Sequence, residues 1–273
     1  METGQVWYTC AMAPILFTLG WIDVPSFTAL MALALGAGLW LTWLQARQTS
    51  PVPSDVLDVA FAAVLLGVIA ARATYVAANW GYFSMHTDEI AQIWQGGLTW
   101  HGGLAGGLIG AALASVWRKL SIQPAFDALT PGLMAGAAFG WLACYLGGVA
   151  YGREIFPGDF MWFLAADLPD IYGLWNPRFS TQLLGAVWAA VCLVVALALS
   201  RHSLQKPQAK ISAFAATIAV YSAGMFVLGF TRGDAVPMIG AWRLDQILDA
   251  GIVVVGIVCA ALVARRRPLS THQ

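Results

Sequence analysis

Seven stretches of about 20 mostly apolar residues constrain this chain more than any other feature of its sequence. They cover roughly residues 26–46, 56–78, 98–117, 125–149, 181–200, 212–230 and 245–264. Each is long enough to cross the ~30 Å hydrocarbon core of a bilayer as an α-helix. Only 10% of the residues are charged and 59% are hydrophobic, too little charge to cover a soluble domain of 273 residues. We therefore expect an all-α polytopic membrane protein with about seven transmembrane helices, forming one integral membrane domain over residues 1–273.

Charge and hydrophobicity each exclude one other class of protein. With 14 Lys and Arg against 14 Asp and Glu, the chain has no positive excess for a nucleic-acid interface. Its high hydrophobicity excludes an intrinsically disordered chain. The first 25 residues carry Glu2 and Asp23 and lack a basic start, so we expect no cleaved signal peptide.

Basic residues divide unequally between the two sets of alternate loops. One set holds nine: Arg47, Arg118, Lys119, Arg201, Lys206, Lys210, Arg265, Arg266 and Arg267. The other set holds four: Arg153, Arg178, Arg232 and Arg243. Because cytoplasmic loops carry the excess of Lys and Arg, we expect the N-terminus outside and the C-terminus in the cytoplasm. The long loops 79–97, 150–180 and 231–244 then form a head region that faces the periplasm or exterior.

Several ionisable residues fall inside or at the outer ends of the apolar stretches. They are Arg72, His101, Arg153, Arg232, Asp245 and Asp249. Such residues are costly in a membrane and mark candidate sites. An imidazole and three arginines at one depth suit an anionic lipid head group, because Arg binds phosphate bidentately and His is a common general base near neutral pH. The residues alone thus indicate an outward-facing site for a phosphate-bearing amphiphile.

Each candidate also has a purely structural interpretation. Arg72 could extend its side chain to the membrane interface, as Arg side chains near helix ends do. His101 could be a hydrogen-bonded structural histidine, although its flanking glycines would let a ligand approach the imidazole closely. Asp245 and Asp249, one turn apart at a predicted helix start, could simply complement the helix dipole.

The run WQGGLTWHGGL at residues 94–104 resembles the glycine-rich histidine motif of prolipoprotein diacylglyceryl transferases. Further segments resemble that family in the same order along roughly residues 55–250. They are Arg72 with Tyr75, Asp127 with Pro131, residues 140–152, residues 177–183 and residues 232–234.

The resemblance implies a bacterial plasma (inner) membrane enzyme of lipoprotein biosynthesis. It would transfer the diacylglyceryl group of phosphatidylglycerol to the lipobox cysteine in the signal peptide of a prolipoprotein, in contact with membrane lipid and without metal, cofactor or nucleic acid. His101 and Arg232 would be catalytic. The substrate-binding residues would be Arg72, Tyr75, Gly102, Gly103, Trp141, Gly152, Arg153 and Asp234.

Residues 140–152 depart from the family's signature. Aligned on the outer glycines, the family's phosphate-binding Arg falls on Trp141, its Asn on Cys144 and its Glu on Val149. A charge-assisted contact of this kind contributes about 1.5–3 kcal/mol, so another cation must replace it, and Arg153 and Arg72 are the candidates. The departure favours an alternative: a catalytically inactive relative that acts as a lipid-binding accessory or as a subunit of a membrane complex. A transporter is a weaker alternative, because the inner half of the bundle offers only Asp127 as an ionisable group.

Overall fold

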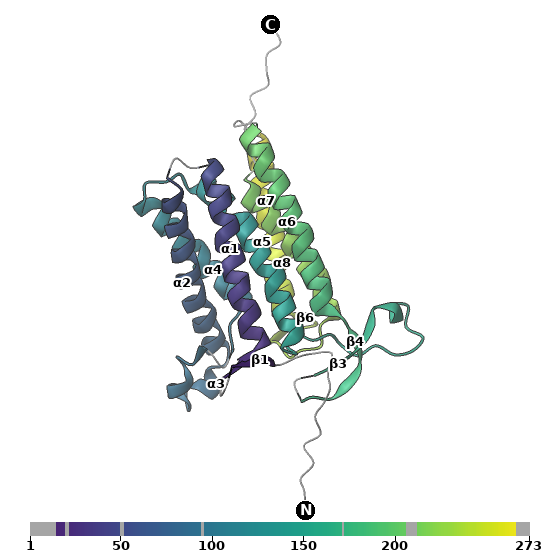
Figure 1. Cartoon of the computed structure of the whole chain (residues 1–273). Coiled ribbons are helices and arrows are strands. Elements are labelled where there is room, and N and C mark those ends of the chain that lie inside the picture. The colour runs from purple at the N-terminus through teal and green to yellow at the C-terminus, as the bar shows by residue number, and fades with distance from the viewer. Residues whose placement is uncertain are drawn as a thin grey trace, which may run out of the picture.

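The computed structural model describes residues 15–19, 22–49, 52–93, 96–170, 172–205 and 212–265. The described residues include seven long helices, which run roughly alongside one another in a bundle (Figure 1). They are α1 (Ser26–Thr49), α2 (Pro53–Ala78), α4 (Trp100–Trp117), α5 (Ile122–Leu146), α6 (Thr181–Gln205), α7 (Ala213–Leu228) and α8 (Leu244–Arg265). Each corresponds to one of the predicted apolar stretches. Among the described residues, α1, α2, α5, most of α6 and the segment Ala213–Thr231 are long and apolar enough to cross a membrane. A multi-pass helical membrane protein is thus confirmed.

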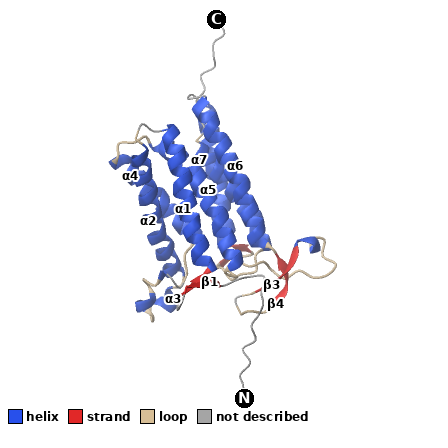
Figure 2. Cartoon of the chain, viewed as in Figure 1, coloured by secondary structure: helices blue, strands red, loops and turns tan. Residues whose placement is uncertain are grey.

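Short strands occupy one end of the bundle, which we call the head end (Figure 2). They form three antiparallel pairs: β1 (Ile15–Leu19) with β2 (Ile22–Pro25), β3 (Ala165–Pro169) with β4 (Trp175–Phe179), and β5 (Met238–Ile239) with β6 (Trp242–Arg243). The short helix α3 (Trp80–Phe83) lies at the same end (Figure 1). The all-α prediction therefore needs correction here. These strands have two to five residues each, too few for a periodic pattern to reveal them.

A stripe of glycines brings α4 close to α2. A Cβ atom at Gly102 would overlap the side chain of Thr74, and one at Gly106 would overlap Ala70. The next glycine of the stripe, Gly110, faces a backbone carbonyl of α2 at similarly close range. Lipid tails are as apolar as Leu, so membrane helices associate through close van der Waals packing of small residues rather than through the hydrophobic effect.

Two polar groupings stabilise the end of the bundle opposite the head end. The Asp127 carboxylate of α5 accepts hydrogen bonds from the Ser212 hydroxyl (2.7 Å) and from the backbone N–H of Phe214 (2.9 Å). Asp127 therefore helps to satisfy the N–H groups at the start of α7, which have no partner within the helix. Arg118 follows α4 and pairs with Asp58 of α2, so the prediction that Asp127 is the only ionisable group in this half of the bundle is wrong.

We expect Gly106→Ala to destabilise the bundle by about 1–3 kcal/mol, because the added methyl group would force α4 away from α2. The matched control is Gly107→Ala on the same helix, where the nearest atom would be a carbonyl oxygen of α2 at 3.4 Å. That change should be neutral or slightly stabilising, since Ala favours helix more than Gly does. Thermal unfolding of the purified variants in detergent measures both, and equal melting temperatures would contradict the packing role of Gly106.

Candidate active site

His101 and Asp249 meet at the head end although 148 residues separate them in the chain. His101 lies in the first turn of α4, and its Nε2 is 3.1 Å from Oδ1 of Asp249 in α8. The Asp249 side chain is 5% exposed and that of His101 is 18% exposed. A neutral imidazole has one N–H donor and one acceptor nitrogen, so a carboxylate at one nitrogen leaves the other able to take a proton.

Several aromatic side chains contact one another next to this pair. The ring of Trp100 lies 5.5 Å from that of Tyr221 in α7. Trp141 of α5 donates from Nε1 to the Tyr221 hydroxyl at 3.1 Å, and Trp188 of α6 donates to the Tyr221 carbonyl at the same distance. Trp141, which the sequence predicts at the position of the family's phosphate-binding Arg, thus belongs to an aromatic cluster that extends to Trp100, the neighbour of His101.

Two arginines and two aspartates form a second polar cluster at the start of α8. Arg232 donates from Nε and Nη2 to the two oxygens of Asp234, at 2.9 and 2.5 Å, and from Nη1 to Asp245 at 3.0 Å. Arg243 also binds both carboxylates, at 3.1 Å to Asp234 and 3.3 Å to Asp245. We call these four residues the Arg–Asp cluster. Three of the five N–H groups of Arg232 are used in these bonds.

The electrostatics of the Arg–Asp cluster keep Arg232 charged. Burial acts to lower the pKa of Arg232, but the hydrogen bonds to Asp234 and the negative charges of Asp234 and Asp245 outweigh it and raise the pKa overall. The cluster holds two positive and two negative side chains. An anion bound here would therefore need a further cation to balance its charge.

The backbone next to Arg153 is paired with the backbone at Arg232. Gly152 and Arg232 form an antiparallel bridge, and the backbone N–H of Arg153 donates to the Thr231 carbonyl at 2.8 Å. A side chain at Gly152 would overlap the carbonyl oxygen of Phe179, so the close approach of this segment to Phe179 requires glycine. Arg153 is exposed, its Nε donates to the Phe230 carbonyl at 3.2 Å, and no ion pair of the described residues includes it.

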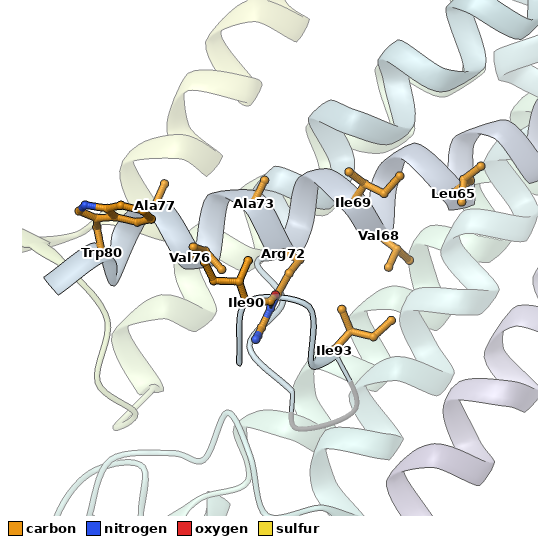
Figure 3. Close-up of a pocket in the computed structure, with 10 residues that line it drawn as sticks. All are labelled: Leu65, Val68, Ile69, Arg72, Ala73, Val76, Ala77, Trp80, Ile90 and Ile93. Carbon is orange, nitrogen blue, oxygen red and sulfur yellow. The ribbon is translucent and has the colours of Figure 1, made fainter. Parts of the chain in front are cut away.

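Arg72 lies on the other side of α4. Its guanidinium group donates to four backbone carbonyls, those of Glu89, Ile90, Gly96 and Gly97, at 2.7–3.2 Å. The same group lies 5.7 Å from the ring of Tyr75. Figure 3 shows Arg72 extending from α2 to the segment that carries Ile90 and Ile93, beside an otherwise apolar cavity of about 650 Å³ along α2. Arg72 thus ties this segment to the helix.

Other predicted residues divide between the two sides of α4. Gly102 and Gly103 face Thr74 and Ala71 of α2, whereas His101 faces α8. The structure brings His101 to Asp249, and it brings Arg153, Gly152, Arg232 and Asp234 together through their backbones and side chains. Tyr75 and the two glycines lie with Arg72 instead.

The sequence did not reveal the partners of the predicted residues. Asp245 and Asp249 stood out as acids near a membrane span, but a role at the helix dipole explained them equally well. No sequence pattern indicated that Tyr221 or Arg243 belongs to the site. Among the described residues, no three His, Cys, Asp or Glu side chains converge in a way that could hold a metal ion.

Fold and site together define a polytopic membrane protein with a histidine–carboxylate pair and an arginine cluster at one end of its helices. The sequence profile of the prolipoprotein diacylglyceryl transferase family matches residues 14–262, and the chain belongs to this family. Among similar proteins is the phosphatidylglycerol–prolipoprotein diacylglyceryl transferase of Thermosynechococcus vestitus, 30% identical over 87% of this chain and 88% of the relative. The enzymes of the same name from Acaryochloris marina and Bacillus licheniformis are 31% and 29% identical, over 93% of this chain and 93% and 92% of their own lengths.

We expect Arg72→Met to loosen the segment that Arg72 holds, because four carbonyls lose a charged donor. Lost bonds to charged groups of this kind destabilise by about 1.5–3 kcal/mol. Hydrogen–deuterium exchange of residues 86–93 should become faster, while Arg47→Met, a change at an exposed arginine of α1, should leave that exchange unaltered. Unchanged exchange together with lost activity would instead favour the substrate-binding role that the family resemblance implies.

Proposed function

We propose that this protein transfers the diacylglyceryl group of phosphatidylglycerol to the lipobox cysteine of prolipoproteins. The observation that carries the proposal is His101 of the glycine-rich motif, held at the head end with Arg153 and Arg232 on neighbouring segments. Relatives that match about nine-tenths of the chain carry the name of this activity. The partners are then phosphatidylglycerol and the signal peptide of a prolipoprotein.

The proposal includes an orientation in the bacterial plasma membrane. We infer seven spans, with α4 and α8 added to the five helices that meet the length and hydropathy expected of a span. The excess of basic residues in the other set of loops supports a head end, with the loops 79–97, 150–180 and 231–244, that lies outside the cytoplasm. The whole chain is then a single integral membrane domain whose site opens to the face where lipoprotein signal peptides are held.

In the proposed reaction, His101 takes the proton of the acceptor thiol. The thiolate attacks C3 of the glyceryl group, a C–S bond forms, and the C–O bond to phosphate breaks. Glycerol-1-phosphate leaves with the electron pair. Deprotonation matters because the thiolate, not the thiol, is the nucleophile. Arg232 stabilises the charge on the phosphate as it departs.

Arg153 supplies the cation that the substituted signature position lacks. It is exposed and pairs with no carboxylate of the described residues, whereas the Arg72 donors already bind backbone carbonyls. With Arg153 added to the neutral Arg–Asp cluster, the site gains the positive charge that a phosphate requires. Arg153 and the two remaining N–H groups of Arg232 would then hold the phosphate.

The other predicted residues shape the site. Trp141 contributes an apolar surface beside the glyceryl and acyl groups, and Gly152 allows the Arg153 segment to lie close against Phe179. Asp234 orients Arg232. Four more residues bind the substrate from the side of α4 that faces α2: Arg72, Tyr75, Gly102 and Gly103.

Two features favour the inactive alternative. Arg232 is bound by both Asp234 and Asp245, and Trp141 stands at the family's phosphate-binding Arg. A protein in which these contacts persist would bind lipid without transferring it, and would serve as an accessory or a subunit of a membrane complex.

We expect the purified protein, in vesicles that contain phosphatidylglycerol, to add a diacylglyceryl group to a lipobox peptide. His101→Ala should abolish this modification, whereas His86→Ala, a change at a histidine of the head end, should not. Mass spectrometry of the peptide measures the transfer, and complementation of a transferase-depleted bacterial strain tests it in cells. A wild-type protein that leaves the peptide unmodified, while the Bacillus licheniformis relative succeeds, would favour the inactive alternative.

We expect Arg153→Gln to raise the KM for phosphatidylglycerol by roughly 10- to 100-fold, the equivalent of a charge-assisted contact. Arg153→Lys should recover part of this loss, because Lys keeps the charge but not the bidentate geometry. Arg201→Gln, at an exposed arginine of α6 near the opposite end of the bundle, serves as the control and should leave KM unchanged. If the KM of Arg153→Gln is unaltered, a group other than Arg153 binds the phosphate.

A further inference from the structure

We propose that Asp249 is a positioning residue for His101: it holds the proton on Nε2 of the imidazole and keeps Nδ1 available as the base. This inference rests on the proposed function, because it assigns to His101 the proton transfer of that reaction. Its starting point is the 3.1 Å contact between His101 Nε2 and Asp249 Oδ1.

The helix dipole does not explain an acid at this position. Asp249 is the sixth residue of α8, which begins at Leu244, and the dipole effect falls off within the first turn. Asp245, one turn earlier, is the residue placed to benefit from it.

The surroundings of Asp249 also set it apart from the other acids of the site. The residue Asp249 as a whole is 4% exposed. Among the ion pairs of the described residues, its one partner is His101. A carboxylate buried in a membrane helix is costly unless a hydrogen-bond donor satisfies it. The imidazole N–H is that donor.

The pairing decides which nitrogen of the ring can act. An ionised carboxylate is an acceptor only, so the hydrogen bond requires the proton on Nε2. The neutral ring then has an unprotonated Nδ1. When this nitrogen takes the thiol proton, the resulting imidazolium lies against the negative charge of Asp249 and is stabilised by it, as in other histidine–carboxylate pairs.

One helix also links the base to the phosphate-binding side. Asp245 and Asp249 are four residues apart on α8 and therefore lie on the same face, where Asp245 binds Arg232 at 3.0 Å and Asp249 binds His101. Rigid spacing along α8 thus sets the position of His101 relative to Arg232.

The test is Asp249→Asn, in which the amide can donate to Nε2 and so favour the opposite tautomer. We expect kcat for lipobox-peptide modification to fall by roughly 10²- to 10⁴-fold, the range of general acid–base catalysis, with KM for phosphatidylglycerol changed little. Asp249→Glu should recover part of kcat because it restores the carboxylate. Melting temperatures in detergent identify the variants that remain folded.

Ring-nitrogen NMR of ¹⁵N-histidine-labelled protein in lipid nanodiscs provides a second measurement that does not depend on catalysis. The His101 signals, assigned with His101→Gln, should show an Nε2–H tautomer in the wild type and a shift toward Nδ1–H in Asp249→Asn. Asp245→Asn is the matched control, and the tautomer of His101 should survive it.

The outcomes separate this inference from the proposed function. An active wild type whose Asp249→Asn variant is folded, keeps its kcat and keeps its tautomer would overturn the positioning role and leave the function standing. An inactive wild type would overturn the function, and the NMR result would still decide whether Asp249 sets the tautomer. A lower melting temperature with tautomer and kcat unchanged would assign Asp249 a structural role only.

Discussion

The absence of water from the bilayer interior is the constraint on which this structure depends. A backbone N–H or C=O group in hydrocarbon must find its partner within the protein, and a helix satisfies nearly all of them internally. The long apolar stretches therefore form helices, and the short strands of the described residues lie at one end of the bundle (Figure 2). The candidate site lies at one of these ends, the position where a polar reaction can meet a lipid substrate.

At the head end, charged groups are held largely by one another. Asp249 is satisfied by His101, and Arg232 and Arg243 share the carboxylates of Asp234 and Asp245. Each pairing lowers the cost of placing a charge near the membrane, and each also fixes the direction of a side chain. The contacts that lower this cost therefore also fix the orientation of the imidazole and of the guanidinium groups.

The sequence predicts that Trp141 stands at a signature position where the family has a phosphate-binding Arg, and we propose that another cation replaces it. Trp141 cannot bind phosphate through a charge, and the structure instead places it in an aromatic cluster with Tyr221. Arg153 lies on a segment bridged to that of Arg232, which makes it the better placed of the two candidate substitutes. Arg72, the other, is occupied by the backbone of the segment it holds.

The sequence by itself determined the helices, because apolar length is a local property: the stretch predicted at 181–200 is part of α6 and that at 26–46 part of α1. It also determined the family and singled out His101. The strands of the head end are too short to leave a pattern. Only the tertiary structure decided that His101 meets Asp249 across 148 residues and that Arg72 faces away from them. Those contacts follow from the rotation and closeness of packed helices, which the glycines of α4 set, and no single segment contains that information.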